Sequence, residues 1–204
     1  MNKAIILLLI FLGNSIYSQN IQDDNILEQI SEKYNSYDNI NFIFDLKYEN
    51  VTQNINTTKV CSLSIKKNKY ILETEDQIIT NDAENQWIYL KEINEVQIMK
   101  NDTSNNMIRL DQLFNIYKKG FKQSNLKTSD KIMIIDVFPN KSSAFIKIQL
   151  HINKEKKQLY KVIVIDKEGG KLSYIISSFE TNKNDKNFIF DKKQYPGVEI
   201  IDLR

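Results

Sequence analysis

The sequence predicts an α+β fold in which about ten antiparallel strands form the body and two helices are added to it. Short apolar runs follow one another with only a few polar residues between them, which leaves room for hairpin turns but not for crossover helices. Strict apolar–polar alternation over Ile40–Tyr48 is typical of a strand with one buried face. Two other segments show the three-and-four spacing of a helix.

The first eighteen residues have the layout of a secretory signal peptide. Lys3 gives a positive charge, Ala4–Leu12 is an uninterrupted apolar stretch, and the small residue Ser18 precedes the expected cleavage site. The apolar stretch is too short to cross a membrane as a helix, which needs about 20 residues. We therefore expect residues 1–18 to be removed and residues 19–204 to form a single exported domain.

Composition argues against several classes of function. The formal net charge is only +2, so the chain lacks the strong excess of basic residues that is typical of a nucleic-acid-binding protein. One cysteine, Cys61, allows no intrachain disulfide, and its alternation with Leu63 and Ile65 predicts a buried apolar position. The one histidine, His151, lies on the polar side of a predicted strand. A zinc site or a Cys–His nucleophile pair would need unusual partners, so we expect no catalytic residues, no metal and no cofactor.

The N-terminal half alternates between one helix and a series of strands. Asn25–Tyr37 is predicted to be helical because its apolar residues recur on one face, and Ile40–Tyr48 is the clearest strand. Glu49–Thr58 is predicted to be a polar loop. The meander that follows has the predicted strands Cys61–Ile65, Tyr70–Leu72, Gln77–Ile79, Trp87–Leu90 and Val96–Met99, and we expect Leu63, Ile65, Tyr70, Leu72, Trp87 and Tyr89 to share one continuous face.

The C-terminal half begins with the second predicted helix, Met107–Lys119. Gly120 stands where a left-handed residue would end it, and a short apolar helix between two sheet regions must cover a sheet face. Glu168–Lys171 is a good hairpin turn because glycine accepts positive φ. The predicted strands are Ile132–Phe138, Phe145–Ile152, Leu159–Ile165, Leu172–Phe179 and Phe188–Phe190, with Ile146, Ile148, Leu150 and Ile152 facing one way.

Taken together, these segments resemble the periplasmic outer-membrane lipoprotein carrier family, LolA, in its Bacteroidetes type. The motifs that carry the resemblance are Lys66–Tyr70, Thr80–Tyr89, Leu110–Phe121 and the tail Phe188–Arg204, FIFDKKQYPGVEIIDLR. The family often has an aspartate–glycine turn where this chain has Asp82-Ala83. The resemblance implies an incomplete antiparallel β-barrel, open on one side, whose hydrophobic concave face is closed by helices.

The resemblance also implies a function. The protein would be a monomeric periplasmic carrier that holds the acyl chains of lipoproteins and moves them from an inner-membrane ABC-type release complex to the outer membrane, where an acceptor protein is a further candidate partner. A basic residue, usually arginine in the family, would tie barrel to lid. The implied positions are Phe42, Phe44, Tyr70, Leu72, Trp87 and Tyr89 for the lipid-binding cavity, Leu110, Leu113 and Phe114 for the lid helix, and Lys66 or Lys67 for the latch.

Other interpretations of the same residues remain open. Each cavity position could be an ordinary core residue, because a sheet with one wet face must bury the other. A periplasmic lipid-binding sensor or chaperone could use the same plan without transport. A secreted hydrolase would need ionisable groups that converge in a pocket. An outer-membrane barrel would need strands of about 10 residues that alternate towards lipid, and most predicted strands are shorter.

Overall fold

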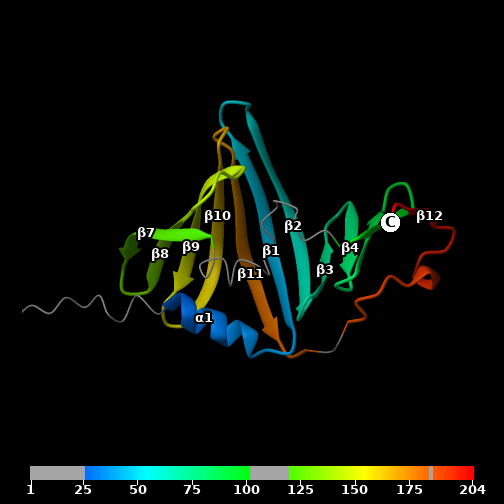
Figure 1. The fold of residues 1–204 in the computed structure, drawn as a ribbon, viewed down its shortest axis with the longest axis horizontal. Helices are drawn as coiled ribbons and strands as arrows, with labels where there is room; N and C mark the ends of the chain where they lie inside the picture. Colours follow the sequence, from blue (N-terminus) through cyan, green and yellow to red (C-terminus); the bar gives the residue numbers. More distant parts are fainter. Residues whose placement is uncertain (1–25, 102–119, 184–185) are drawn as a thin grey trace, which may run out of the picture.

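The computed structural model describes residues 26–101, 120–183 and 186–204, and in these ranges one long sheet has a single α-helix packed against it (Figure 1). The elements, in chain order, are α1 (Ile26–Asn35), β1 (Ile40–Asn50), β2 (Ile55–Lys66), β3 (Lys69–Glu73), β4 (Gln77–Asn81), β5 (Asn85–Leu90), β6 (Glu95–Lys100), β7 (Phe121–Thr128), β8 (Ile132–Pro139), β9 (Phe145–Asn153), β10 (Gln158–Asp166), β11 (Lys171–Thr181), the short 3-10 helix η3 (Lys192–Gln194) and β12 (Glu199–Asp202).

The sheet is open and almost wholly antiparallel. Its strand order is β12-β6-β5-β4-β3-β2-β1-β11-β10-β9-β8-β7, so β12 and β7 lie at its two ends. β12 pairs with β6 in parallel, and the other neighbours pair antiparallel. The open antiparallel sheet confirms that part of the fold prediction, although the described ranges hold twelve strands instead of about ten.

The helix α1 lies across the lower part of the sheet, beside the ends of β9, β10 and β11 (Figure 1). Its buried residues include Ile26, Ile30 and Tyr34, the face that the three-and-four spacing predicted. Glu28 in its first turn and Lys33 in its last turn have the charges that the helix dipole favours. The predicted first helix is therefore confirmed within the described range, which starts at Ile26.

We call the face of the sheet that α1 covers the inner face and the other the outer face. The main hydrophobic core lies between α1 and the inner face, and it includes Phe42 and Phe44 of β1. Cys61 belongs to the same core and is 1% exposed, which confirms its predicted burial. The buried residues from the other half of the sheet are Met133, Ile135, Val137, Phe145, Ile148, Leu150, Ile152, Leu159, Val162 and Tyr174.

Three element predictions were wrong. Glu49–Thr58 is not a loop, because β1 continues to Asn50 and β2 starts at Ile55 (Figure 1). Phe188–Phe190 is not a strand; it belongs to the irregular tail that leads to η3. A register shift pairs Phe145 with Asp166, so Phe145 is 9% exposed and Ile146 is 49% exposed instead of facing inward.

Two predicted segments, the signal peptide and the helix Met107–Lys119, lie outside the described residues. The removal of the signal peptide and the position of the second helix therefore stay predictions. None of the helices in the described ranges combines the length and apolar character that a membrane span needs.

Candidate functional site

A row of apolar residues crosses the inner face from the middle of the sheet towards its β12 end. Phe42 pairs with Leu63, Leu63 with Leu72, and Leu72 with Ile79. Ile79 in turn pairs with Ile88 on β5. Paired residues of antiparallel strands project from the same face, so these five side chains form one row, which we call the inner row.

Burial decreases along the inner row. Phe42 is 2% exposed and Leu63 is 6% exposed. Leu72 and Ile79 are partly buried against the core, and Ile88 is half-buried. The row therefore starts in the packed core under α1 and ends as partly accessible apolar surface on β4 and β5.

The deep end of the inner row is packed by aromatic rings. The ring of Phe42 lies 6.4 Å from Tyr34 of α1 and 5.3 Å from Phe179 of β11, measured between centroids. Phe44 lies 5.9 Å from Tyr174, and burial raises the pKa of Tyr174 to about 12. These contacts give Phe42 and Phe44, two of the predicted cavity residues, a role in holding α1, β1 and β11 together.

Tyr70 and Leu72 of β3 are also on the inner face, as predicted. Tyr70 pairs with Ile65, and Leu72 pairs with Leu63. The Tyr70 hydroxyl donates to Gln86 Oε1 at 3.0 Å, which satisfies a polar group that is only 9% exposed.

Trp87 and Tyr89 lie on the outer face, so the prediction that they share a face with Tyr70 and Leu72 was wrong. Trp87 pairs with Thr80, and Thr80 pairs with Ile71. Ile71 lies between Tyr70 and Leu72 on the same strand and therefore points to the other side. The sheet register thus separates these two aromatic residues from the other predicted cavity positions.

The C-terminal tail packs against this outer surface. The ring centroid of Tyr195 lies 4.3 Å from Tyr89 and 5.0 Å from Phe190, and burial raises the pKa of Tyr195. The Tyr89 hydroxyl donates to Asn94 Oδ1, and Asn94 Nδ2 donates to the Pro196 carbonyl. Tyr89 therefore has a structural role in fixing the tail.

The inner-row residues that sequence reasoning missed are Ile79 and Ile88. Leu72 and Ile79 lie at equal distances from the Thr74–Gln77 turn, whose ends are joined by a hydrogen bond from the Thr74 amide to the Gln77 carbonyl. In a tight hairpin, residues equidistant from the turn become cross-strand neighbours. This equal spacing could have identified Ile79 from the sequence. The same spacing on either side of the next turn would have identified Ile88.

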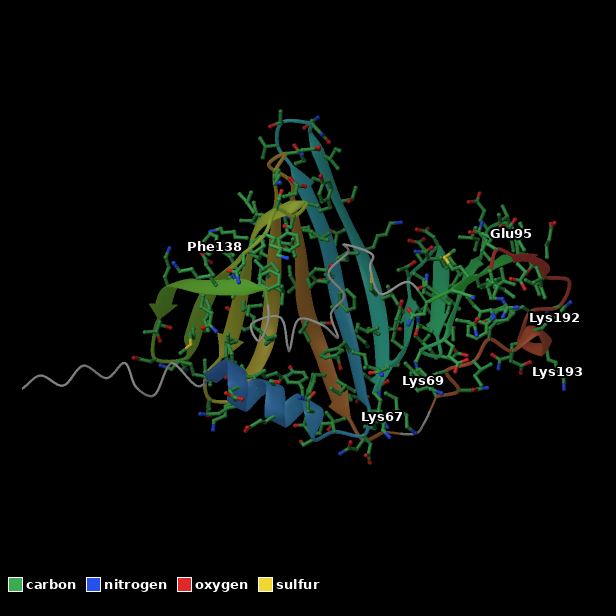
Figure 2. The ribbon with its side chains drawn as sticks, in the orientation of Figure 1. Lys67, Lys69, Glu95, Phe138, Lys192 and Lys193 are labelled. Carbon is green, nitrogen blue, oxygen red and sulfur yellow. The ribbon has the colours of Figure 1, made fainter. Side chains whose placement is uncertain are left out.

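The proposed latch residues lie at the turn between β2 and β3. Lys66 pairs with Lys69, and it follows Ile65 of the inner face, so its position in the register is on the outer face. Lys67 is exposed in the turn with φ of 55°, and Figure 2 shows it at the lower edge of the sheet. The lid residues Leu110, Leu113 and Phe114 lie outside the described residues, so the latch stays a prediction.

The polar groups near the sheet centre include one histidine and one ion pair. His151 of β9 is half-buried, its ring meets Tyr160 edge-on, and burial followed by the charge of Lys161 lowers its pKa. Asp136 forms an ion pair with Lys147 at 2.9 Å. In the described part of the chain, no group of three or more His, Cys, Asp or Glu residues is arranged to hold a metal ion.

Known proteins similar to this chain share its fold. A family model described as "Outer membrane lipoprotein carrier protein LolA" matches residues 47–171, and no curated protein sequence is detectably similar. A candidate outer membrane lipoprotein-sorting protein domain from Vibrio parahaemolyticus has a TM-score of 0.50 and 12% identity, covering 84% of this chain and 97% of its own. An uncharacterized conserved protein from Thermus thermophilus has a TM-score of 0.53 and 10% identity, covering 89% and 99%.

The family model matches a shorter part of the chain than the motifs that carry the resemblance. The match spans more than half of the chain, from β1 to the start of β11, and includes most of the inner row. It ends at residue 171, so the tail Phe188–Arg204, one of the four motifs that carry the resemblance, lies beyond it. The structural similarities, at identities this low, support the fold alone.

Proposed function

The chain belongs to the LolA family of outer membrane lipoprotein carrier proteins, and on this premise we propose that it is a periplasmic carrier for the acyl chains of lipoproteins. Members of the family are carriers and binders, not enzymes. The proposed cargo is received from an inner-membrane ABC-type release complex and handed to the outer membrane.

The observation that carries the proposal is the inner row. It provides apolar side chains on neighbouring strands that are buried on β1 and β2 and partly accessible on β3, β4 and β5. An acyl chain needs no directional partners, so a row of aliphatic side chains is a sufficient binding surface. The proposed binding surface is accordingly Leu72, Ile79 and Ile88, with Phe42 as its closed end.

The energetics favour an enclosed cargo. Burial of one methylene is worth about 0.8 kcal/mol. Two or three acyl chains of roughly 14–16 carbons would therefore cost on the order of 25–40 kcal/mol if left in water. Diffusion of free lipoprotein through the periplasm is excluded at that scale, so the carrier must shield the chains reversibly. The predicted helix Met107–Lys119 is the proposed cover.

The experiment compares two adjacent isoleucines of β4. Ile79 faces inward on the inner row, and Ile78, paired with Tyr89, faces outward. The wild type, Ile79→Glu and Ile78→Glu are purified from the periplasm of the native bacterium, and acylated lipoproteins that co-purify are identified by mass spectrometry. Thermal unfolding of each variant confirms that it is folded.

We expect the wild type and Ile78→Glu to carry lipoproteins and Ile79→Glu to lose them, because a carboxylate on the inner row must be desolvated when a chain binds. A wild-type protein without acylated cargo would contradict the transport role. Equal cargo on both variants would instead contradict the inner row as the binding surface.

A further inference from the structure

The strands β10 and β11 separate from each other in the part of the sheet nearest to α1. The two strands pair only from Lys161–Ile175 to Ile165–Lys171. Below this pairing, Gln158 and Leu159 of β10 pair with β9, and Ile176 and residues 178–181 of β11 pair with β1; Tyr160 and Ser177 lie at register shifts. The facing backbone edges of β10 and β11 therefore separate towards the end of the sheet where α1 lies.

A cavity of about 260 Å³ occupies this opening. Its apolar lining is Leu159, which is 1% exposed, together with the partly buried Ile176 and Phe179. The remaining lining is polar: Asn153, Lys156, Gln158, Tyr160, Ser177 and Ser178. The cavity is thus amphipathic, and its volume lies just below that of common small-ligand pockets, about 300–1,000 Å³.

Lysines gather around the mouth of this cavity. Lys156 lines it from the turn between β9 and β10, and Lys157 follows in the same exposed turn. The Lys154 amide donates to the Lys131 carbonyl, which brings the turn between β7 and β8 alongside. From α1, Lys33 Nζ donates to the Lys156 carbonyl at 2.7 Å. Three elements therefore bring lysines together at one corner of the molecule, where Asp130 and Glu155 are the acidic residues of the two turns.

The charge of this corner is part of a larger asymmetry. Residues 120–183, which form β7 to β11, carry twelve lysines against six acidic residues. Residues 38–101 and 186–204, which form β1 to β6, η3 and β12, carry eleven lysine and arginine residues against thirteen acidic residues, and α1, which lies at the β7–β11 end, adds Lys33 against Glu28 and Glu32. One end of the open sheet is therefore basic and the other slightly acidic, so an anionic surface would attract the molecule by its β7–β11 end.

We propose that the cavity between β10 and β11 and the lysines at its mouth form a binding site for the headgroup of an anionic phospholipid at a membrane surface. Lys131, Lys156 and Lys157 would face the phosphate and its neighbours in the bilayer. Leu159, Ile176 and Phe179 would contact the first methylenes of that one lipid. The site borders the closed end of the inner row, since the ring of Phe179 lies 5.3 Å from that of Phe42, and a headgroup site at this place goes beyond the proposed carrier function.

The lining favours a membrane lipid over a soluble anion or an acidic protein. A free phosphate gains nothing from the apolar wall of Leu159 and Phe179. An acidic protein would need complementary side-chain pockets, whereas lysines distributed over two turns suit a surface of many equivalent headgroups, at which each lysine adds attraction. The amphipathic cavity would hold one lipid of the bilayer more deeply than the lipids around it.

The first test measures sedimentation of the full-length mature protein with vesicles of phosphatidylglycerol and phosphatidylcholine, and with vesicles of phosphatidylcholine alone. We expect binding only to the anionic vesicles, weakened by salt. The triple variant Lys131→Glu, Lys156→Glu, Lys157→Glu should bind at least on the order of 100-fold more weakly. The matched control is Lys186→Glu, Lys192→Glu, Lys193→Glu, which changes the net charge equally.

The control lysines are exposed in the C-terminal tail, and Figure 2 shows Lys192 and Lys193 at the end of the molecule far from α1. We expect the control to retain anionic vesicle binding within about threefold, because two of its three charges, Lys192 and Lys193, lie far from the docking corner. Equal binding to both kinds of vesicle, or equal loss in both triple variants, would overturn the proposal.

The second test addresses the cavity by NMR with dihexanoyl phosphatidylglycerol below its micelle concentration and with inorganic phosphate. The lipid should shift the amides of Ser177, Ser178 and Phe179, and phosphate should bind at least tenfold more weakly. Ser178→Phe, which fills the cavity, should abolish the lipid-induced shifts while the protein stays folded by its own spectrum. Shifts confined to other residues, or equal binding of phosphate and lipid, would overturn the cavity site.

Discussion

Tyr34 of α1 lies edge-on against Phe179 of β11, with ring centroids 5.3 Å apart and an interplanar angle of 62°. Tyr34 also lies 6.4 Å from Phe42, so one side chain joins α1 to two neighbouring strands. It is 3% exposed. We expect Tyr34→Ala to lower the free energy of unfolding by about 3 kcal/mol, because it removes a large buried ring and leaves a cavity.

Urea unfolding at neutral pH checks this value. Tyr37→Ala is the matched control, since Tyr37 is only half-buried and meets Tyr34 and Phe179 at 6.5 Å and 6.1 Å. Its cost should be less than half that of Tyr34→Ala. Equal costs would show that α1 is held mainly by contacts other than the aromatic cluster.

Ala83 has φ of 84°, a left-handed conformation that only glycine adopts without strain. The turn is held there by side chains: Asn81 Oδ1 accepts from the Ala83 amide, and Asp82 Oδ1 accepts from the amides of Glu84 and Asn85. We expect Ala83→Gly to raise the stability by about 0.5–1 kcal/mol, which is about 1–4 °C in Tm for a chain of this size.

Differential scanning calorimetry checks this prediction. Ala144 has no positive φ and is exposed, so Ala144→Gly should be neutral or destabilising, because glycine only adds freedom to the unfolded chain there. A loss of stability in Ala83→Gly would mean that the hydrogen bonds around the turn remove the strain.

The contrast between β1 and β5 explains how far the sequence predicts this sheet. On β1, apolar and polar residues alternate through Phe42 and Phe44, so the inner face could be assigned directly. On β5, Trp87–Leu90 is continuously apolar, and such a run does not reveal which residues face inward. The assignment of Trp87 and Tyr89 failed because the register is set by the preceding turn.

The two end strands were missed for another reason. β7 is polar and rich in lysine, and β12 has only four residues, so neither shows a buried face. Edge strands are commonly short or charged, which removes the alternation on which sequence prediction depends. The parallel pairing of Glu199 with Glu95 joins residues far apart in the chain and has no local signal at all.

His151 gives the protein a pH-dependent stability. Burial, and then the charge of Lys161, lowers its pKa below the ordinary value, while Asp136 acts in the opposite direction more weakly. A base with a lowered pKa in the folded state binds its proton more readily in the unfolded chain. Its contribution to stability is therefore fully present above pH of about 6.5 and is lost as the pH falls through its folded pKa.

We expect His151→Gln to remove this component of the pH dependence. The test is the urea midpoint at pH 7.5 and at pH 5.0: the wild type should lose more stability between them than the variant, because glutamine does not titrate. Carboxylates titrate in both proteins and cancel in the comparison. An equal loss of stability in the wild type and the variant would mean that His151 is solvated in the folded protein.

Asp136 and Lys147 form a partly buried ion pair on the outer face. Nζ of Lys147 lies 2.9 Å from Oδ2 of Asp136, with side-chain exposures of 25% and 7%. Within the described ranges Oδ1 of Asp136 has no hydrogen-bond partner. Lys147→Met leaves a buried carboxylate without its cation, and we expect it to cost about 2–3 kcal/mol, somewhat below the range for fully buried pairs because Lys147 reaches solvent.

Replacement of both partners should be tolerated far better. In Asp136→Leu with Lys147→Met the carboxylate is gone along with the lysine, so no buried charge remains and stability should return to within about 1 kcal/mol of the wild type. The control is the exposed pair of Lys183 and Glu180, 3.6 Å apart, in which Lys183→Met should cost less than about 0.5 kcal/mol. A double variant as unstable as Lys147→Met alone would mean that Lys147 acts through packing of its aliphatic stem and not through its charge.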